Sequence, residues 1–135
     1  MINKLAFVLV VYKDEILLGY NPSKNRLEYF GGHVEDGESY KECAIRELYE
    51  ETAGTILANN VLLIYEKPSV KIFLHRLYEK PNLNTFYKNR RKYLKMGLKH
   101  YTEMTELVLL DLKDILENKN LIHHHTWDII VNYFD

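Results

Sequence analysis

The chain opens with a continuous apolar run from Ala6 to Val11, rich in β-branched residues. This pattern is typical of a strand that is buried on both faces of a sheet. A polar turn separates it from a second run, Ile16–Tyr20, which we expect to pair with it as an antiparallel neighbour. A third, short strand is expected at Leu27–Phe30, directly before the glycine pair at 31–32.

After residue 37 the apolar positions follow the period of a helix. Ser39 and Glu42 have the spacing of a capping box, in which each side chain accepts a hydrogen bond from the other residue's backbone amide. The helix is predicted to run to about Thr52. It should end near Gly54, because glycine suits the left-handed conformation that closes many helices.

The remaining elements follow from the same patterns, and no repeat or linker divides the chain. We therefore predict a single domain over residues 1–135, of the α+β class, with a mixed β-sheet and a few helices. Strands are expected at 61–65, 70–78 and 107–110, a short helix at 112–117, and a last helix at 126–134.

Composition restricts the class of protein further. Of the 135 residues, 47% are hydrophobic and 27% are charged, enough to fill a core and to coat it with charge, which excludes disordered and fibrous chains. No apolar run approaches the ~18 residues of a membrane span. The single cysteine, Cys43, cannot form an internal disulfide, and the first residues lack the apolar core of a signal peptide. We expect a soluble cytoplasmic protein with no membrane partner.

Charge is distributed unevenly along the chain. The formal net charge is −1, yet residues 80–102 contain seven basic residues and no acidic one. The rest of the chain has eleven basic and nineteen acidic residues. We favour an amphipathic connecting helix with a solvated basic face. The alternative is a surface for phosphorylated substrates or an RNA end, formed by segment 80–99 and in particular by Arg90, Arg91 and Lys92.

Three glutamates gather on one side of the predicted helix. With ~100° per residue, Glu47, Glu50 and Glu51 lie within about 100° of one another on the helical wheel, beside the apolar stripe. Such a pattern is most often a solvated acidic face, since like charges at these spacings repel. Hard divalent cations, however, prefer carboxylate oxygens as ligands, so Mg²⁺ or Mn²⁺ binding is the functional alternative.

The segment before these glutamates favours the functional alternative. From Gly32, five residues lead to Glu38, and seven more lead to Arg46-Glu47-Leu48-Tyr49-Glu50-Glu51. This spacing resembles the Nudix box, G-x5-E-x7-R-E-U-x-E-E-x-G-U, where U is aliphatic. Two positions depart from the usual pattern: Ala53 stands at the final glycine, and Phe30 stands where proline is frequent before the glycine pair. Neither departure removes an acidic residue.

The resemblance implies an α/β/α sandwich that hydrolyses a nucleoside diphosphate linked to another group, by attack of water on phosphorus. It also implies roles for the residues of the box. Glu47, Glu50 and Glu51 would bind Mg²⁺ or Mn²⁺ with the carbonyl of Gly32, Glu38 would be a supporting acid or hold a second metal through water, and Arg46 would orient a box carboxylate.

In many members of the family the general base lies in a loop before a late strand. Glu106 directly precedes the apolar run at 107–110 and is the first candidate for this base. Glu103 is the second candidate, and one of the box glutamates is the third.

The small size of the chain is similar to that of MutT-like nucleoside triphosphate pyrophosphatases, and we favour this activity. Hydrolysis of dinucleoside polyphosphates, inositol pyrophosphates or mRNA caps through segment 80–99 is an alternative. A nucleotide- or RNA-binding module without catalysis is another. A monomer and a homodimer are both compatible with the sequence.

Overall fold

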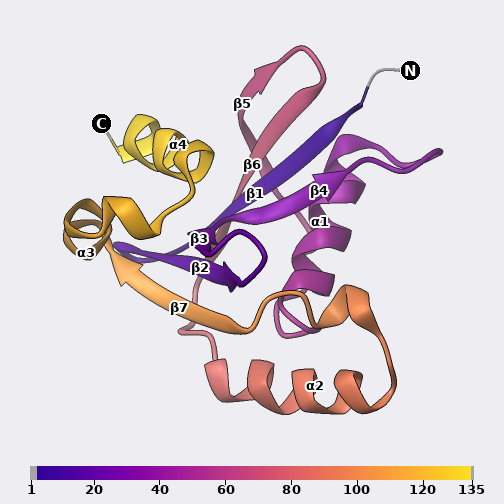
Figure 1. Cartoon of the computed structure of the whole chain (residues 1–135). Helices are drawn as coiled ribbons and strands as arrows, with labels where there is room; N and C mark the ends of the chain where they lie inside the picture. Colours follow the sequence, from indigo (N-terminus) through magenta and orange to yellow (C-terminus); the bar gives the residue numbers. More distant parts are fainter. Residues whose placement is uncertain (1–2, 135) are drawn as a thin grey trace.

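The structure, a computed structural model, describes residues 3–134 (Figure 1). Among these residues, no helix is both long enough and apolar enough to cross a membrane. In chain order the elements are β1 (Leu5–Tyr12), β2 (Glu15–Asn21), β3 (Arg26–Glu28), β4 (Phe30–His33), α1 (Tyr40–Glu51), β5 (Leu62–Lys67), β6 (Val70–Leu77), α2 (Leu83–Lys95), the 3₁₀ turn Lys99–Tyr101, β7 (Glu106–Asp111), α3 (Leu112–Glu117), the 3₁₀ turn Lys119–Leu121 and α4 (His124–Phe134).

The sheet is mixed, as predicted, and β1 is its central strand. One edge of β1 pairs in parallel with β6 along its whole length, and β6 pairs antiparallel with β5. The other edge pairs antiparallel with β4 at residues 5–8 and with β2 at residues 10–12. Strands β3 and β7 both extend the sheet from β2.

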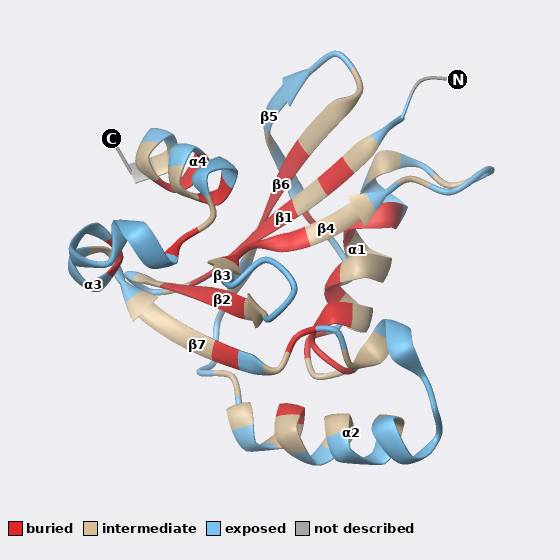
Figure 2. Ribbon diagram, in the orientation of Figure 1, coloured by how far each residue is buried: buried red, intermediate tan, exposed pale blue. Residues whose placement is uncertain are grey.

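Both faces of β1 are buried, in agreement with its continuous apolar run (Figure 2). Ala6, Val8 and Val10 pack into a core with apolar residues of α1 and α2. Leu9 and Val11 face a second core, formed with α3 and α4. The helices therefore cover the two faces of one sheet, which confirms the expected α/β/α sandwich (Figure 1).

Two predicted elements differ in detail, and one interpretation is confirmed. The single strand expected at 27–30 is two strands, because the chain changes partners at Tyr29: β3 pairs with β2, whereas β4 pairs with β1. The last helix begins at His124 rather than at residue 126. The basic segment does form a connecting helix, α2, with Phe86 as its buried anchor.

Both ends of α1 follow local rules. The capping box is present: the Glu42 amide donates to Ser39 Oγ at 3.0 Å, and the Ser39 amide donates to Glu42 Oε1 at 2.9 Å. After the helix, Ala53 and Gly54 both adopt a left-handed backbone, with φ of 50° and 71°. Alanine in this conformation costs about 1 kcal/mol, and the Ala53 side chain is fully buried in the core.

Candidate active site

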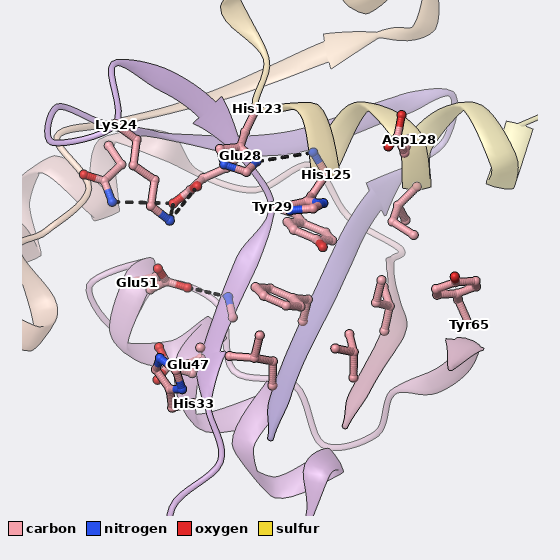
Figure 3. Close-up of a pocket in the computed structure, with 18 of the residues that line it drawn as sticks. Lys24, Glu28, Tyr29, His33, Glu47, Glu51, Tyr65, His123, His125 and Asp128 are labelled. Carbon is pink, nitrogen blue, oxygen red and sulfur yellow. Dashed lines mark hydrogen bonds and ion pairs between the residues drawn. The ribbon is translucent and has the colours of Figure 1, made fainter. Parts of the chain in front are cut away.

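A cavity of about 1130 Å³ opens along the sheet, between the N-terminal parts of β1 and β6 and the helices α1 and α4 (Figure 3). One end is acidic and holds Glu47, Glu50 and Glu51 of α1. At the other side of the cavity lie Tyr65 and Asp128 (Figure 3). A volume of this size is sufficient for a nucleotide-sized ligand.

Arg46 organises the acidic end. Its guanidinium donates to Glu38 Oε2 at 2.7 Å, to Glu47 Oε1 at 3.0 Å and to Glu50 Oε1 at 2.9 Å. It also donates to the His33 carbonyl at 3.1 Å, which ties the helix to the end of β4. The bond from Arg46 holds the pKa of Glu38 below its ordinary value, because it favours the ionised carboxylate.

Glu51 is engaged differently from the other two box glutamates. It is only 7% exposed, and its Oε1 accepts a hydrogen bond from the Gly31 amide at 2.6 Å. Burial raises its pKa well above the ordinary value, and the charge of Glu47 raises it further. Burial also raises the pKa of Glu47, with the charges of Glu50 and Glu103 acting in the same direction. A bound cation would favour the ionised form of these carboxyl groups and so oppose both effects.

The glycine pair permits this close packing. A Cβ on Gly31 would lie 2.3 Å from the Ala6 carbonyl oxygen, and a Cβ on Gly32 would lie 2.7 Å from Glu47 Oε1. A side chain at position 31 would force β4 away from the backbone of β1, and one at position 32 would displace the Glu47 carboxylate. The glycines thus bring the strand backbone next to the acidic helix face.

The chemistry of these donors fits a hard divalent cation. Within residues 3–134, no three His, Cys, Asp or Glu side chains are already gathered as a ligand set. In this structure Arg46 engages Glu47 and Glu50, while Glu51 bonds to Gly31. Oxygen ligands and unbalanced negative charge are nevertheless what Mg²⁺ or Mn²⁺ requires. The Gly32 carbonyl, the other candidate ligand, accepts a weak bond from Cys43 Sγ at 3.6 Å.

The raised pKa of Glu51 predicts a pH dependence of stability in the metal-free protein. Because the folded state favours protonated Glu51, the free energy of unfolding should fall as pH rises from about 4.5 through the raised pKa. Glu51→Gln removes this charge while its amide oxygen can still accept the Gly31 hydrogen bond. We compare the free energy of unfolding of the variant with that of the wild type. Between pH 5 and pH 8 this difference should shift in favour of the variant by about 1 kcal/mol or more.

Urea denaturation in EDTA at pH 5 and pH 8 measures this difference. Glu117→Gln, which removes an exposed glutamate on α3, is the matched control and should follow the wild-type pH dependence. A wild-type stability that is equal at both pH values, or a variant that follows it in parallel, would contradict the assignment of a buried charge at Glu51.

The two loop candidates for a general base occupy different places. Strand β7 begins at Glu106 itself, which pairs with Tyr20 of β2, is exposed and lies outside the described cavity lining. Glu106 is therefore part of the strand, and the loop that precedes the strand covers residues 102–105. Glu103 in this loop lines the cavity, and its charge contributes to the raised pKa of Glu47 and Glu51.

The three basic residues of α2 that the sequence singled out, Arg90, Arg91 and Lys92, also lie outside the described cavity lining. Arg90 is turned into the fold: its Nε donates to the Met104 carbonyl at 2.9 Å, and its Nη2 donates to the Thr102 carbonyl at 3.2 Å. Arg91 and Lys92 are exposed. The structure thus separates one arginine with a role inside the fold from two cations on the outer face of the helix.

Sequence reasoning missed the far wall of the cavity. Phe7 of β1 and Tyr29 stack with ring centroids 4.8 Å apart, and Tyr65 and Trp127 line the same space. These four residues are far apart in the sequence, so no local pattern marks them as one group. Glu28, which is 7% exposed and paired with Lys24 at 3.1 Å, also lines the cavity.

Carboxylates on a helix, a glycine-bearing strand beside them and an α/β/α sandwich form the site and the fold of this chain. The NUDIX domain family model matches residues 3–125, and the chain therefore belongs to this family. The resemblance of the box is thereby confirmed, and the protein is a pyrophosphohydrolase of the Nudix type. Hydrolases of this family generally need divalent metal ions.

Solved structures share the fold at low sequence identity. A NUDIX hydrolase from Nitrosomonas europaea is 16% identical, with a TM-score of 0.66 over 99% of this chain and 89% of that one. The MutT protein from Methanosarcina mazei is 18% identical, with a TM-score of 0.60 over 97% and 91%. A NUDIX family hydrolase from Clostridium perfringens is 17% identical, with a TM-score of 0.58 over 96% and 94%. At these identities the likeness concerns the fold alone.

Proposed function

We propose that this protein is a Mg²⁺- or Mn²⁺-dependent nucleoside triphosphate pyrophosphatase similar to MutT. One observation carries the proposal: the acidic end of the cavity is continuous with an aromatic end (Figure 3). A nucleoside triphosphate has the same polarity, with a highly charged phosphate chain joined to a flat apolar base. Its phosphates would lie beside α1 and its base beside the aromatic side chains.

At the acidic end, Glu47, Glu50 and Glu51 would hold the divalent cation. Such a cation screens the charge of the phosphate oxygens and stabilises charge that develops on the leaving oxygen. Arg46 would keep Glu38 ionised and orient the carboxylates through its planar donor fork.

The reaction then needs a group that takes a proton from the attacking water. We assign this role to Glu103, because it lines the cavity and faces the charges of Glu47 and Glu51. As the water oxygen bonds to phosphorus, its proton passes to the Glu103 carboxylate. The anhydride P–O bond breaks, and its electron pair stays on the departing phosphate oxygen.

At the aromatic end, the stacked pair of Phe7 and Tyr29 forms part of the floor, with Tyr65 and Trp127 beside it. Aromatic faces of this kind stack on bases with an energy of about 1–3 kcal/mol. Asp128 lies at the same end of the cavity and offers a hydrogen-bond acceptor to a base that carries N–H donors (Figure 3).

The positive charge on and after α2 supports a second candidate class of substrates. Arg91, Lys92 and Lys95 are exposed on one face of α2, and Lys99 and His100 follow it. His100 lines the cavity, so an anionic chain that leaves the acidic end would pass near these cations. This arrangement favours long or highly phosphorylated substrates, namely dinucleoside polyphosphates, inositol pyrophosphates or a capped RNA end.

Product analysis over a substrate panel tests the proposal. The panel holds (d)NTPs, oxidised (d)NTPs, ADP-ribose, nucleotide sugars, diadenosine polyphosphates, an inositol pyrophosphate and capped RNA, each with Mg²⁺ and with Mn²⁺. We expect a nucleoside triphosphate to give monophosphate and pyrophosphate. Release of m⁷GDP from RNA would instead establish the second candidate. No product with either metal would overturn both and favour a nucleotide-binding module without catalysis.

A further inference from the structure

We propose that α2 is a brace for the catalytic loop, with Arg90 as the positioning residue that holds Glu103 opposite the box helix. The inference rests on the proposed role of Glu103 and adds a residue that touches neither substrate nor metal. It also gives α2 a function inside the fold that its basic composition does not suggest.

The hydrogen bonds of Arg90 carry the inference. One guanidinium donates to the carbonyls of Thr102 and Met104, the residues directly before and after Glu103. The backbone on both sides of Glu103 is therefore tied to one rigid planar group. Glu103 itself is exposed, whereas Met104 is buried, so the loop has an anchored side and a side that faces the cavity.

A second set of contacts ties α2 to the box helix. The Asn89 side chain, next to Arg90 on α2, donates to the Ala53 carbonyl at 3.0 Å, just after the end of α1. The ring of Tyr101 stacks on that of Tyr93 of α2, with ring centroids 4.5 Å apart. It also forms a T-shaped contact with the ring of Tyr49 of α1, with centroids 6.1 Å apart. Helix α2 thus contacts the loop that carries Glu103 and the residue that follows α1, and Tyr101 links it to Tyr49 of the box helix.

The position of the Glu103 carboxylate relative to the box carboxylates matters, because a proton transfer needs a well-placed acceptor. A displacement of about 1 Å can lower a rate by about 10²-fold. An exposed loop glutamate without a brace would sample many positions, since its local interactions are few. Arg90 reduces this freedom by holding the backbone, which leaves the Glu103 carboxylate free to exchange protons.

Hydrogen exchange tests the brace without reference to catalysis. The Thr102 amide bonds to the Lys99 carbonyl at 3.1 Å, and the Thr105 amide bonds to the Tyr20 carbonyl at 3.0 Å, so both report on opening of the loop. In metal-free Arg90→Gln we expect these amides to exchange about tenfold faster or more, with little change in β1. Arg90→Lys should be intermediate, because an ammonium keeps the charge but not the planar two-carbonyl fork.

Arg26→Gln is the matched control. Arg26 is exposed, lies outside the described cavity lining, and also donates to a backbone carbonyl, that of Asn25 at 2.7 Å. Its substitution should leave exchange at Thr102 and Thr105 as in the wild type. Unchanged exchange in Arg90→Gln, or equal acceleration in the control and throughout the sheet, would overturn the brace.

A double-mutant cycle tests whether the brace acts through Glu103. The probe is the nucleoside triphosphate of the panel with the highest turnover, at saturating metal. We expect Arg90→Gln to lower kcat about tenfold with little change in KM, but less than about twofold when Glu103 is already Gln. Losses that multiply in the double variant would show that Arg90 acts elsewhere. A Glu103→Gln variant with full kcat would overturn the base assignment, and the exchange result would still decide whether Arg90 holds the loop.

Discussion

Replacement of Glu50 by Gln is expected to lower kcat by about 10³-fold or more, equivalent to ~4 kcal/mol of transition-state stabilisation. The change removes one negative charge and one strong oxygen ligand from the acidic end, and keeps the size of the side chain. The fold should persist, because the Glu50–Arg46 pair is partly exposed and Arg46 retains its bonds to Glu38 and Glu47.

The measurement is steady-state turnover of the nucleoside triphosphate across a titration of Mg²⁺ and of Mn²⁺, with thermal unfolding as the check on folding. Chelation by EDTA should abolish turnover of the wild type. Glu117→Gln on α3 has the same chemical change at an exposed position and should retain wild-type turnover. Full activity in Glu50→Gln would remove the box from the mechanism.

Replacement of Glu103 by Gln is expected to have the second-largest effect. A general base contributes typically 10²–10⁴-fold, so kcat should fall by about 10²-fold or more while KM changes little. Glutamine cannot accept the proton of the attacking water, so the loss should be present at every pH measured. We would measure kcat and KM between pH 5 and pH 9 at saturating metal.

Glu106→Gln decides between the two loop candidates. Glu106 lies three residues further on, at the start of β7 and outside the described cavity lining, so its substitution should lower kcat far less than that of Glu103. A larger loss at Glu106 than at Glu103 would contradict the assignment and would restore the residue that directly precedes the apolar run as the base.

These two predictions depend on the sequence to different degrees. The box residues Arg46, Glu47, Glu50 and Glu51 lie within two turns of one helix, so their spacing alone places them together. Helix α1 in turn has local start and stop signals, the capping box at Ser39 and the left-handed residues 53 and 54. Here the sequence predicts the geometry, because the residues that contact one another are only a few positions apart in the chain.

The position of the general base is a different problem. A shift of the strand boundary by one residue, to Glu106, moves the loop toward the N-terminus and makes Glu103 the residue in the cavity. Strand boundaries depend on pairing with a distant partner, here Tyr20 and its neighbours in β2. A sequence pattern locates such boundaries only to within a few residues.

The sequence by itself determined the α+β class with a mixed sheet, the buried central strand, the box helix and the identity of the acidic residues, because periodicity and spacing act over one or two turns of chain. The α/β/α arrangement was expected only from the resemblance to the Nudix box. The tertiary structure decided what those residues face. It brought Phe7, Tyr65 and Trp127 to one cavity, turned Arg90 from a surface cation into an inward donor, and placed Glu103 rather than Glu106 beside the box. Each of these outcomes depends on packing between segments far apart in the chain, which local preference does not encode.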